Sequence, residues 1–244
     1  MNNIKIVSLA DAEAVAQAAA AHVVTLAQAA IAQHGRFSLA LAGGSTPKAL
    51  YHLLVQPPFR TQIAWDKTVL FWSDERFVAP DDPDSNFLLA REALLDQIEI
   101  PAANIFPVPT VGGTAEAAAA AYAETISALF EGPPRFDLIL LGIGPDGHTA
   151  SLFPGHPEVA APPQPLVIAV YDSPKPPATR ISFTLPLIND ANVLVLATGA
   201  EKADAVRRCL QPQPGEDVPP AGLVRPSGGE LVWMIDAAAG RDLK

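Results

Sequence analysis

The chain has 244 residues, of which 49% are hydrophobic and 17% charged, a length and composition typical of a globular protein with one large α/β domain or two small ones. Its 16 Lys and Arg against 26 Asp and Glu give a formal net charge of −10, and so acidic a surface is repelled by nucleic-acid backbones and anionic lipids, which we therefore do not expect as partners. The single cysteine, Cys209, excludes an internal disulfide and any multi-cysteine metal site, and indicates a reducing compartment.

The N-terminal region predicts a long helix. Ser8 and Asp11 have the Ser-x-x-acid spacing of a capping box, and apolar residues then recur on roughly one face up to Gly35. The first residues lead into no uninterrupted apolar run with a small-residue cleavage site, and no later run reaches the ~18 apolar residues of a membrane span. We therefore expect a cytoplasmic protein.

Apolar runs with the character of buried strands follow, and helical runs separate several of them. The predicted strands are 37–41, 68–72, 136–141, 166–170, 192–197 and 231–235, and the further predicted helices are 48–54, 86–97, 114–130 and 201–210. This alternation predicts a mostly parallel sheet covered on both faces, in which ligands bind beyond the carboxyl ends of the strands. Because no long linker or repeat interrupts the pattern, we expect a single domain over residues 1–244. The Pro-rich stretches 162–165, 174–177 and 211–220 are expected to be surface loops.

The first glycine-rich turn, Gly43-Gly44-Ser45-Thr46-Pro47, lies between a predicted strand and a predicted helix. Backbone N–H groups and two hydroxyls at the positive end of the helix dipole would suit a phosphate. An ordinary tight turn with a Ser or Thr cap explains the same residues equally well. The P-loop pattern is absent, which argues against a nucleoside triphosphate.

The second glycine-rich turn, residues 142–147, formally matches the dinucleotide-binding pattern Gly-x-Gly-x-x-Gly. That interpretation is disfavoured because Pro154 and Pro157 interrupt the helix that should follow, and Asp172 lies too far along to be the ribose-binding acid. His148 comes directly after this turn. Since imidazole titrates near neutrality, a neutral His148 could take a proton from water, although a capping histidine would look the same.

Charged residues stand at three more element boundaries. Residues 73–76 include Asp74 and Arg76 at the end of a predicted strand, Lys175 and Arg180 flank a predicted loop, and Lys202 begins a predicted helix. Each is most simply a solvated surface charge, but an Arg fork and a Lys near one helix N-terminus would also suit a dianionic phosphate.

Taken together and in order, residues 41–47, 73–76, 142–154 and 173–180 resemble the motifs of the 6-phosphogluconolactonases. That family and the glucosamine-6-phosphate deaminases and isomerases share one fold, which has three α/β/α layers and a mostly parallel, Rossmann-like sheet. The resemblance implies that His148 is the base and that Asp74, Arg76 and Asp146 lie near the sugar ring, with Arg76 a candidate donor to the carbonyl oxygen. It further implies a phosphate site made from the following residues: Gly43, Gly44, Ser45, Thr46, Lys175, Arg180 and Lys202.

Two positions favour the lactonases over the deaminases. The deaminases carry an acid five residues after the histidine and a tyrosine where this chain has Arg76; here the first position is Phe153. The resemblance therefore implies hydrolysis of 6-phosphogluconolactone to 6-phosphogluconate in the oxidative pentose phosphate pathway, with water activated by His148 and a small sugar phosphate as the ligand.

Three further expectations complete the sequence analysis. Scattered histidines make a metal site unexpected, and no cofactor is implied. The main alternative is a glucosamine-6-phosphate deaminase or sugar-phosphate isomerase. A non-enzymatic sugar-phosphate sensor is disfavoured, because such sensors normally need a helix-turn-helix appendage, whereas this chain is acidic and is expected to begin directly with the domain's first helix.

Overall fold

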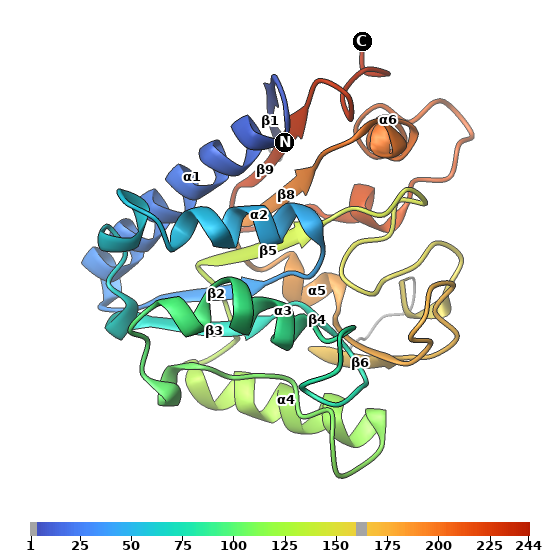
Figure 1. The fold of residues 1–244 in the computed structure, drawn as a ribbon. Helices are drawn as coiled ribbons and strands as arrows, with labels where there is room; N and C mark the ends of the chain where they lie inside the picture. Colours follow the sequence, from blue (N-terminus) through green and yellow to red (C-terminus); the bar gives the residue numbers. More distant parts are fainter. Residues whose placement is uncertain (1–3, 160–164) are drawn as a thin grey trace.

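The computed structural model describes residues 4–159 and 165–244. Their main feature is a six-stranded sheet with the order β1-β9-β8-β5-β2-β3, in which every neighbouring pair is parallel. The strands are β1 (Ile4–Leu9), β2 (Phe37–Leu41), β3 (Thr68–Trp72), β5 (Leu138–Gly142), β8 (Val193–Ala197) and β9 (Leu231–Asp236). Helices cover both faces of this sheet (Figure 1), which confirms the predicted fold class.

Most strands of this sheet are rich in apolar residues because both faces of the sheet are covered. Every residue of β2, β3, β8 and β9 is buried, the pattern expected of a parallel sheet between two layers. Their carboxyl ends therefore open at one common edge of the sheet, where the turns after β2, β5 and β8 come together.

The chain enters the sheet through β1, an edge strand that the sequence analysis missed. Ser8 pairs with Ile235 inside β1, so the prediction that Ser8 caps the first helix was wrong, as was the view that the domain begins with that helix. Asp11 is the actual N-cap, and its Oδ1 accepts a hydrogen bond from Ala14 N at 2.9 Å. Strand β1 is at least partly exposed at every residue, and its pairing with β9 at the far end of the chain is not encoded locally.

Helix α1 (Ala12–His34) ends at Gly35 in the left-handed region with φ 85°, a conformation that glycine adopts without strain. By length and mean hydropathy α1 is long and apolar enough to cross a membrane. The expectation that no stretch of the chain is long enough to span a membrane therefore holds only for uninterrupted runs of apolar residues. Its buried side chains, among them Val15, Ala19 and Val23, belong to the hydrophobic core, as in a core helix. The cytoplasmic location stays a prediction.

A second, antiparallel sheet has the order β4-β7-β6, formed by β4 (Asp74–Arg76), β6 (Val167–Val170) and β7 (Arg180–Phe183). The predicted strand 166–170 therefore exists but does not join the parallel sheet. Ser73 links the two sheets, since its N–H donates to Leu41 O and its carbonyl accepts from Phe183 N, both at 2.8 Å. Arg76 and Arg180 are paired in register, so two cations from distant parts of the chain lie side by side.

The remaining helices are α2 (Ser45–Leu54), α3 (Asn86–Ala93), α4 (Ala115–Leu129), α5 (Leu185–Ile188) and α6 (Ala203–Leu210). The predicted helices 86–97 and 201–210 are each split, with 3₁₀ turns at Leu95–Gln97 and Ala200–Lys202. Pro-rich stretches 174–177 and 211–220 lie mostly in loops, whereas residues 162–164 of the stretch 162–165 lie outside the described residues.

Candidate active site

A cavity of about 210 Å³ opens at the carboxyl edge of the parallel sheet, next to the small sheet. Its wall includes nearly all the residues singled out from the sequence: Gly43, Gly44, Ser45, Thr46, Asp74, Arg76, His148, Lys175, Arg180 and Lys202. Asp146 is not part of the wall and contacts His148 from behind. The fold thus gathers candidates from five separate segments at one place.

The first turn of α2 forms one end of the cavity. Gly44, with φ 103°, precedes Ser45, and no side chain caps the helix and no acid lies in its first turn. The hydroxyl groups of Thr46 and Thr198 are 2.8 Å apart. Thr198 follows β8 and was not predicted from the sequence. An uncapped helix start with two hydroxyls beside it provides donors for an anion.

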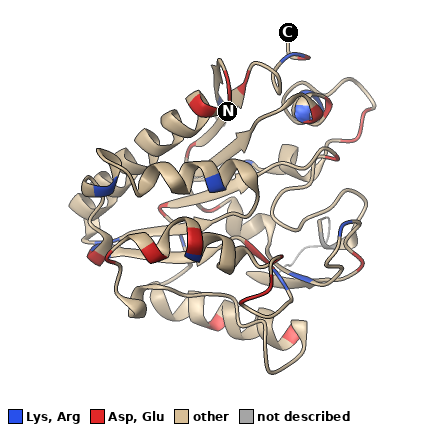
Figure 2. Ribbon diagram, viewed as in Figure 1, with Lys and Arg blue, Asp and Glu red and all other residues tan. Residues whose placement is uncertain are grey.

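Four cations line the same cavity, namely Arg76, Lys175, Arg180 and Lys202, against a single carboxylate, Asp74. Elsewhere Lys and Arg are dispersed among the more numerous Asp and Glu (Figure 2), so this grouping runs against the net charge of the protein. Burial lowers the pKa of Lys202 despite the opposing charge of Glu201, with Lys175 adding to the shift. An anion in the cavity would offset this crowding of positive charge.

Arg180 is the most enclosed of these cations, with 3% of its surface exposed. Its Nε donates to Pro177 O at 3.2 Å and its Nη2 to Lys175 O at 3.0 Å, so the side chain also holds the loop that carries Lys175. Burial and then the charge of Arg76 lower the pKa of Arg180. The charges of Asp74, Asp84 and Glu75 oppose the shift. The guanidinium donates to backbone carbonyls, and its charge is suited to receive an anion.

His148 and Asp146 form a close pair beside the cavity. His148 Nδ1 and Asp146 Oδ1 are 2.6 Å apart, and the same oxygen accepts from His148 N at 3.2 Å. Burial opposes ionisation of Asp146, but its hydrogen bonds and charge interaction with His148 outweigh burial and lower the pKa of Asp146 to about 2. Gly144 makes room for the pair, since a Cβ there would lie 2.1 Å from His148 Nδ1. The imidazole is thus held by a carboxylate that stays ionised.

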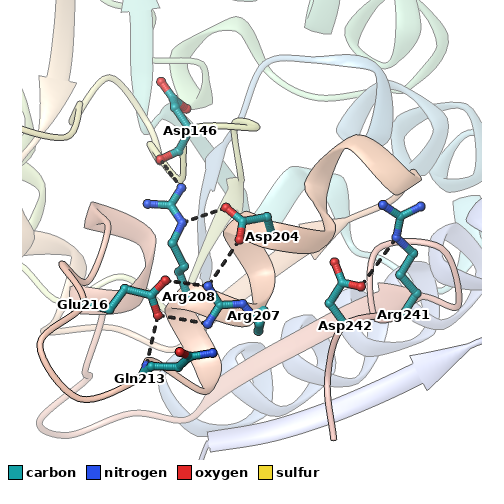
Figure 3. A network of polar contacts seen from close by, with 8 residues as sticks. All are labelled: Asp146, Asp204, Arg207, Arg208, Gln213, Glu216, Arg241 and Asp242. Atoms are coloured by element: carbon teal, nitrogen blue, oxygen red, sulfur yellow. Dashed lines mark hydrogen bonds and ion pairs between the residues drawn. The ribbon is translucent and has the colours of Figure 1, made fainter.

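Helix α6 holds the turn that carries this pair (Figure 3). Arg208 donates through Nη2 to the carbonyl of Asp146 at 3.2 Å and through Nε to Asp204 Oδ2 at 2.9 Å. Ala221 N, in the 3₁₀ turn Pro220–Leu223 after α6, donates to Gly147 O at 3.1 Å. The sequence analysis missed Arg208, because an arginine in the last turn of a helix carries no local sign of a distant partner.

Phe153 contacts both His148 and Arg180. Its ring centroid is 4.6 Å from that of His148, and Arg180 Cζ is 5.7 Å from it. With 1% of its surface exposed, Phe153 offers an apolar surface at the position where the resemblance gives the deaminases an acid.

The opposite wall is built by β4 and the start of α3. Asp74 Oδ2 accepts from Ser151 Oγ at 2.7 Å, and Asn86 Nδ2 donates to Asp74 O at 2.9 Å. The buried Glu75 carboxylate accepts from the backbone N–H groups of Arg76, Asn86 and Phe87, each at 2.7 Å. Burial raises the pKa of Glu75 to about 7, although these hydrogen bonds oppose the shift. Glu75 and Asn86 were not among the predicted site residues.

Metal-ligating side chains are not clustered in the part of the chain that the structure describes, where no group of three or more His, Cys, Asp or Glu is arranged to hold an ion.

Comparisons with known proteins agree on one family. The family model described as glucosamine-6-phosphate isomerases/6-phosphogluconolactonase matches residues 10–233. A 6-phosphogluconolactonase of Synechocystis sp. is 41% identical over 91% of each chain, and one of Streptomyces coelicolor is 40% identical over 96% of this chain and 92% of its own.

Solved structures give the same result. The 6-phosphogluconolactonase of Trypanosoma brucei superimposes with a TM-score of 0.87 at 33% identity, covering 100% of both chains. A monomeric glucosamine-6-phosphate deaminase superimposes with a TM-score of 0.81 at 22% identity, over 98% of this chain and 99% of its own, a likeness of fold alone.

Proposed function

Because the chain belongs to the glucosamine-6-phosphate isomerase/6-phosphogluconolactonase family, we propose that it is a lactone hydrolase that converts 6-phosphogluconolactone to 6-phosphogluconate, a step of the oxidative pentose phosphate pathway. The observation that carries the proposal is the environment of His148. An ionised carboxylate holds one side of the imidazole, a cationic cavity lies on its other side, and an apolar ring, Phe153, packs against it.

His148 acts as the general base in this proposal. When Nδ1–H of the imidazole donates a hydrogen bond to Asp146, the lone pair is on Nε2. Nε2 then takes a proton from water as the water oxygen attacks the lactone carbonyl. The carbonyl oxygen becomes negative, and Arg76 is the candidate donor that stabilises it. The intermediate then collapses by breaking the bond to the ring oxygen, which receives the proton from the imidazolium. Asp146 stays ionised throughout and stabilises the transient positive charge.

The phosphate group binds at the other end of the cavity in this proposal. The uncapped start of α2 offers N–H groups through Gly44, Ser45 and Thr46, and Arg180 with Lys202 supplies charge. Gly43 lines the same cavity and leaves room for the side chain of Asn86, and Lys175 adds a further cation. Since segments of both sheets line one cavity, we further propose that the chain works as a single sugar-phosphate-binding domain.

The deaminase alternative lacks the groups that its chemistry needs. Ring opening and loss of an amine require an additional proton carrier beside the histidine, and Phe153 cannot serve as one. Lactone hydrolysis needs one activated water and one donor to the oxyanion, and both are available here.

A lactonase assay with freshly generated 6-phosphogluconolactone, corrected for spontaneous hydrolysis, tests the proposal. We expect saturable hydrolysis, competitive inhibition by inorganic phosphate, and no ammonia release from glucosamine 6-phosphate. Ammonia release without lactone hydrolysis would replace the lactonase by the deaminase, and purely noncompetitive phosphate inhibition would remove the phosphate site from the start of α2.

A further inference from the structure

We propose that Asn86 is a specificity-determining residue whose side-chain oxygen, Oδ1, accepts a hydrogen bond from a ring hydroxyl of the substrate. The inference rests on the proposed lactonase function and deepens it, because it assigns a recognition role to a cavity residue that has no part in the mechanism above.

Three of the four polar groups of Asn86 are already engaged. Its backbone N–H donates to Glu75 Oε1 at 2.7 Å, and its backbone carbonyl accepts from the indole Nε1 of Trp72 at 3.3 Å. Its side-chain Nδ2 donates to the carbonyl of Asp74 at 2.9 Å. A carbonyl oxygen can only accept, so the contact with Asp74 also determines which end of the amide is nitrogen and which is oxygen. The side chain is therefore fixed in one orientation.

The fourth group, Oδ1, is left free for a ligand. No hydrogen-bond donor among residues 4–159 and 165–244 contacts it. In those residues, the fully buried side-chain atoms without a hydrogen-bond partner are Arg76 Nε and Trp233 Nε1. Asn86 Oδ1 is not one of them, so it is not sealed from the cavity. Asn86 lines the cavity and retains 3% exposure. Its tip lies against Gly43, where a Cβ would be 2.0 Å from Oδ1. The absence of a side chain at Gly43 therefore lets the Asn86 amide take this position.

The chemistry of an amide oxygen selects the partner. Oδ1 is an acceptor and requires a donor, which neither a phosphate dianion nor a lactone carbonyl possesses. The hydroxyl groups of the sugar ring are donors. The cavity therefore has a cationic end, with Arg180 and Lys202, and an acceptor wall, with Asn86 and the Asp74 carboxylate. A phosphorylated lactone with free hydroxyls matches both, and an analogue without the contacted hydroxyl leaves Oδ1 unpaired, a loss that binding sites discriminate strongly.

The test compares each hydroxyl of the ring with the side chain of Asn86. The parent protein and Asn86→Ala are assayed with 6-phosphogluconolactone and with its 2-deoxy, 3-deoxy and 4-deoxy analogues, each freshly generated. Asn86→Ala keeps the backbone contacts with Glu75 and Trp72. We expect kcat/KM for the complete lactone to fall about 10-fold in Asn86→Ala. For one deoxy analogue, kcat/KM of the parent should be lower than for the complete lactone by about the same factor. With that analogue, Asn86→Ala should have the same kcat/KM as the parent.

Ser85→Ala is the matched control. Ser85 caps the same helix, with its Oγ accepting from Leu88 N at 3.2 Å, and it is not part of the cavity wall. The control loosens the start of α3 without removing the acceptor, so it should keep the parent's discrimination among the four lactones. Inhibition by inorganic phosphate should be unchanged in Asn86→Ala, because the phosphate end does not involve this side chain.

The outcomes separate the two proposals. A parent protein without lactonase activity would refute the proposed function. An active parent in which Asn86→Ala lowers kcat/KM by the same factor for all four lactones would overturn the role of Asn86 and leave the function intact, and so would an Asn86→Ala that matches the parent. Circular dichroism checks folding, and if Asn86→Ala does not fold, Asn86→Ser replaces it, since serine suits a helix start and is too short to reach the cavity.

Discussion

Replacing Asp146 by asparagine should slow the chemical step while leaving the binding of the phosphate group intact. The 2.6 Å contact between Asp146 Oδ1 and His148 Nδ1 joins an ionised acceptor to an imidazole that becomes positive during the reaction. The amide removes the negative charge, and if its NH₂ group turns toward Nδ1 it also reverses the tautomer, so that Nε2 carries the proton and can no longer accept one.

The magnitude follows from the nature of this contact. A hydrogen bond to a charged group contributes about 1.5–3 kcal/mol, which corresponds to a roughly 10- to 150-fold fall in kcat if it is realised in the transition state. Reversal of the tautomer would lower kcat further. KM should change little, because Asp146 does not line the cavity.

Asp137→Asn is the matched control, since Asp137 forms a second His–Asp contact far from the cavity. His34 Nε2 and Asp137 Oδ1 are 2.8 Å apart, before the start of β5 and thus at the opposite edge of the sheet. Initial rates with fresh lactone, corrected for spontaneous hydrolysis, give kcat and KM for the parent and both variants. If Asp146→Asn keeps kcat within about threefold of the parent, the carboxylate does not support the base and the proposed mechanism is refuted.

Three further predictions concern other positions. His148→Ala should lower kcat by about 10²–10⁴ with an unchanged circular dichroism spectrum; a folded variant with the parent's rate would exclude His148. Arg180→Ala should mainly raise KM, since a phosphate contact changes little in the transition state, and a lower kcat at constant KM would assign Arg180 to the chemical step. Burial raises the pKa of Glu75 from 4.5 to about 7, so the folded state binds this proton more tightly than the unfolded state. The free energy of unfolding of the parent, relative to that of Glu75→Gln, should therefore decline by up to about 3 kcal/mol as the pH rises from 4.5 to about 7. If urea denaturation gives a difference between the two proteins that does not change with pH, this prediction is wrong.

Much of the site was predictable from local sequence. Parallel strands followed by glycine-rich or charged turns indicate a binding edge, and Gly43–Thr46, Asp74, Arg76 and His148 all follow strands whose apolar runs are plain in the sequence. The cavity that contains them was implied by the resemblance to the lactonases, although the role of each residue stays a prediction.

Local sequence did not determine how two of the strands pair. Residues 166–170 are as apolar as the inner strands and were assigned to the same sheet, yet they pair antiparallel with β7. An apolar run is common to both kinds of sheet, and the loop that carries Lys175 decides which partner the strand reaches. Strand β1 was missed because β9, the strand with which it pairs, comes at the other end of the chain.

The supporting contacts depended on tertiary structure most of all. Glu75, Asn86 and Arg208 are ordinary residues next to a turn or at the end of a helix, and no spacing in the sequence distinguishes them from solvated polar side chains. They acquire their roles because β4 meets the start of α3 and because α6 lies against the turn of Asp146. Sequence by itself determines which residues begin a helix, fill a strand or carry reactive chemistry, because those properties depend on near neighbours. Which side chains hold the reactive ones in place is decided only when distant segments pack, because hydrogen bonds act over about 3 Å of space, whatever the separation along the chain.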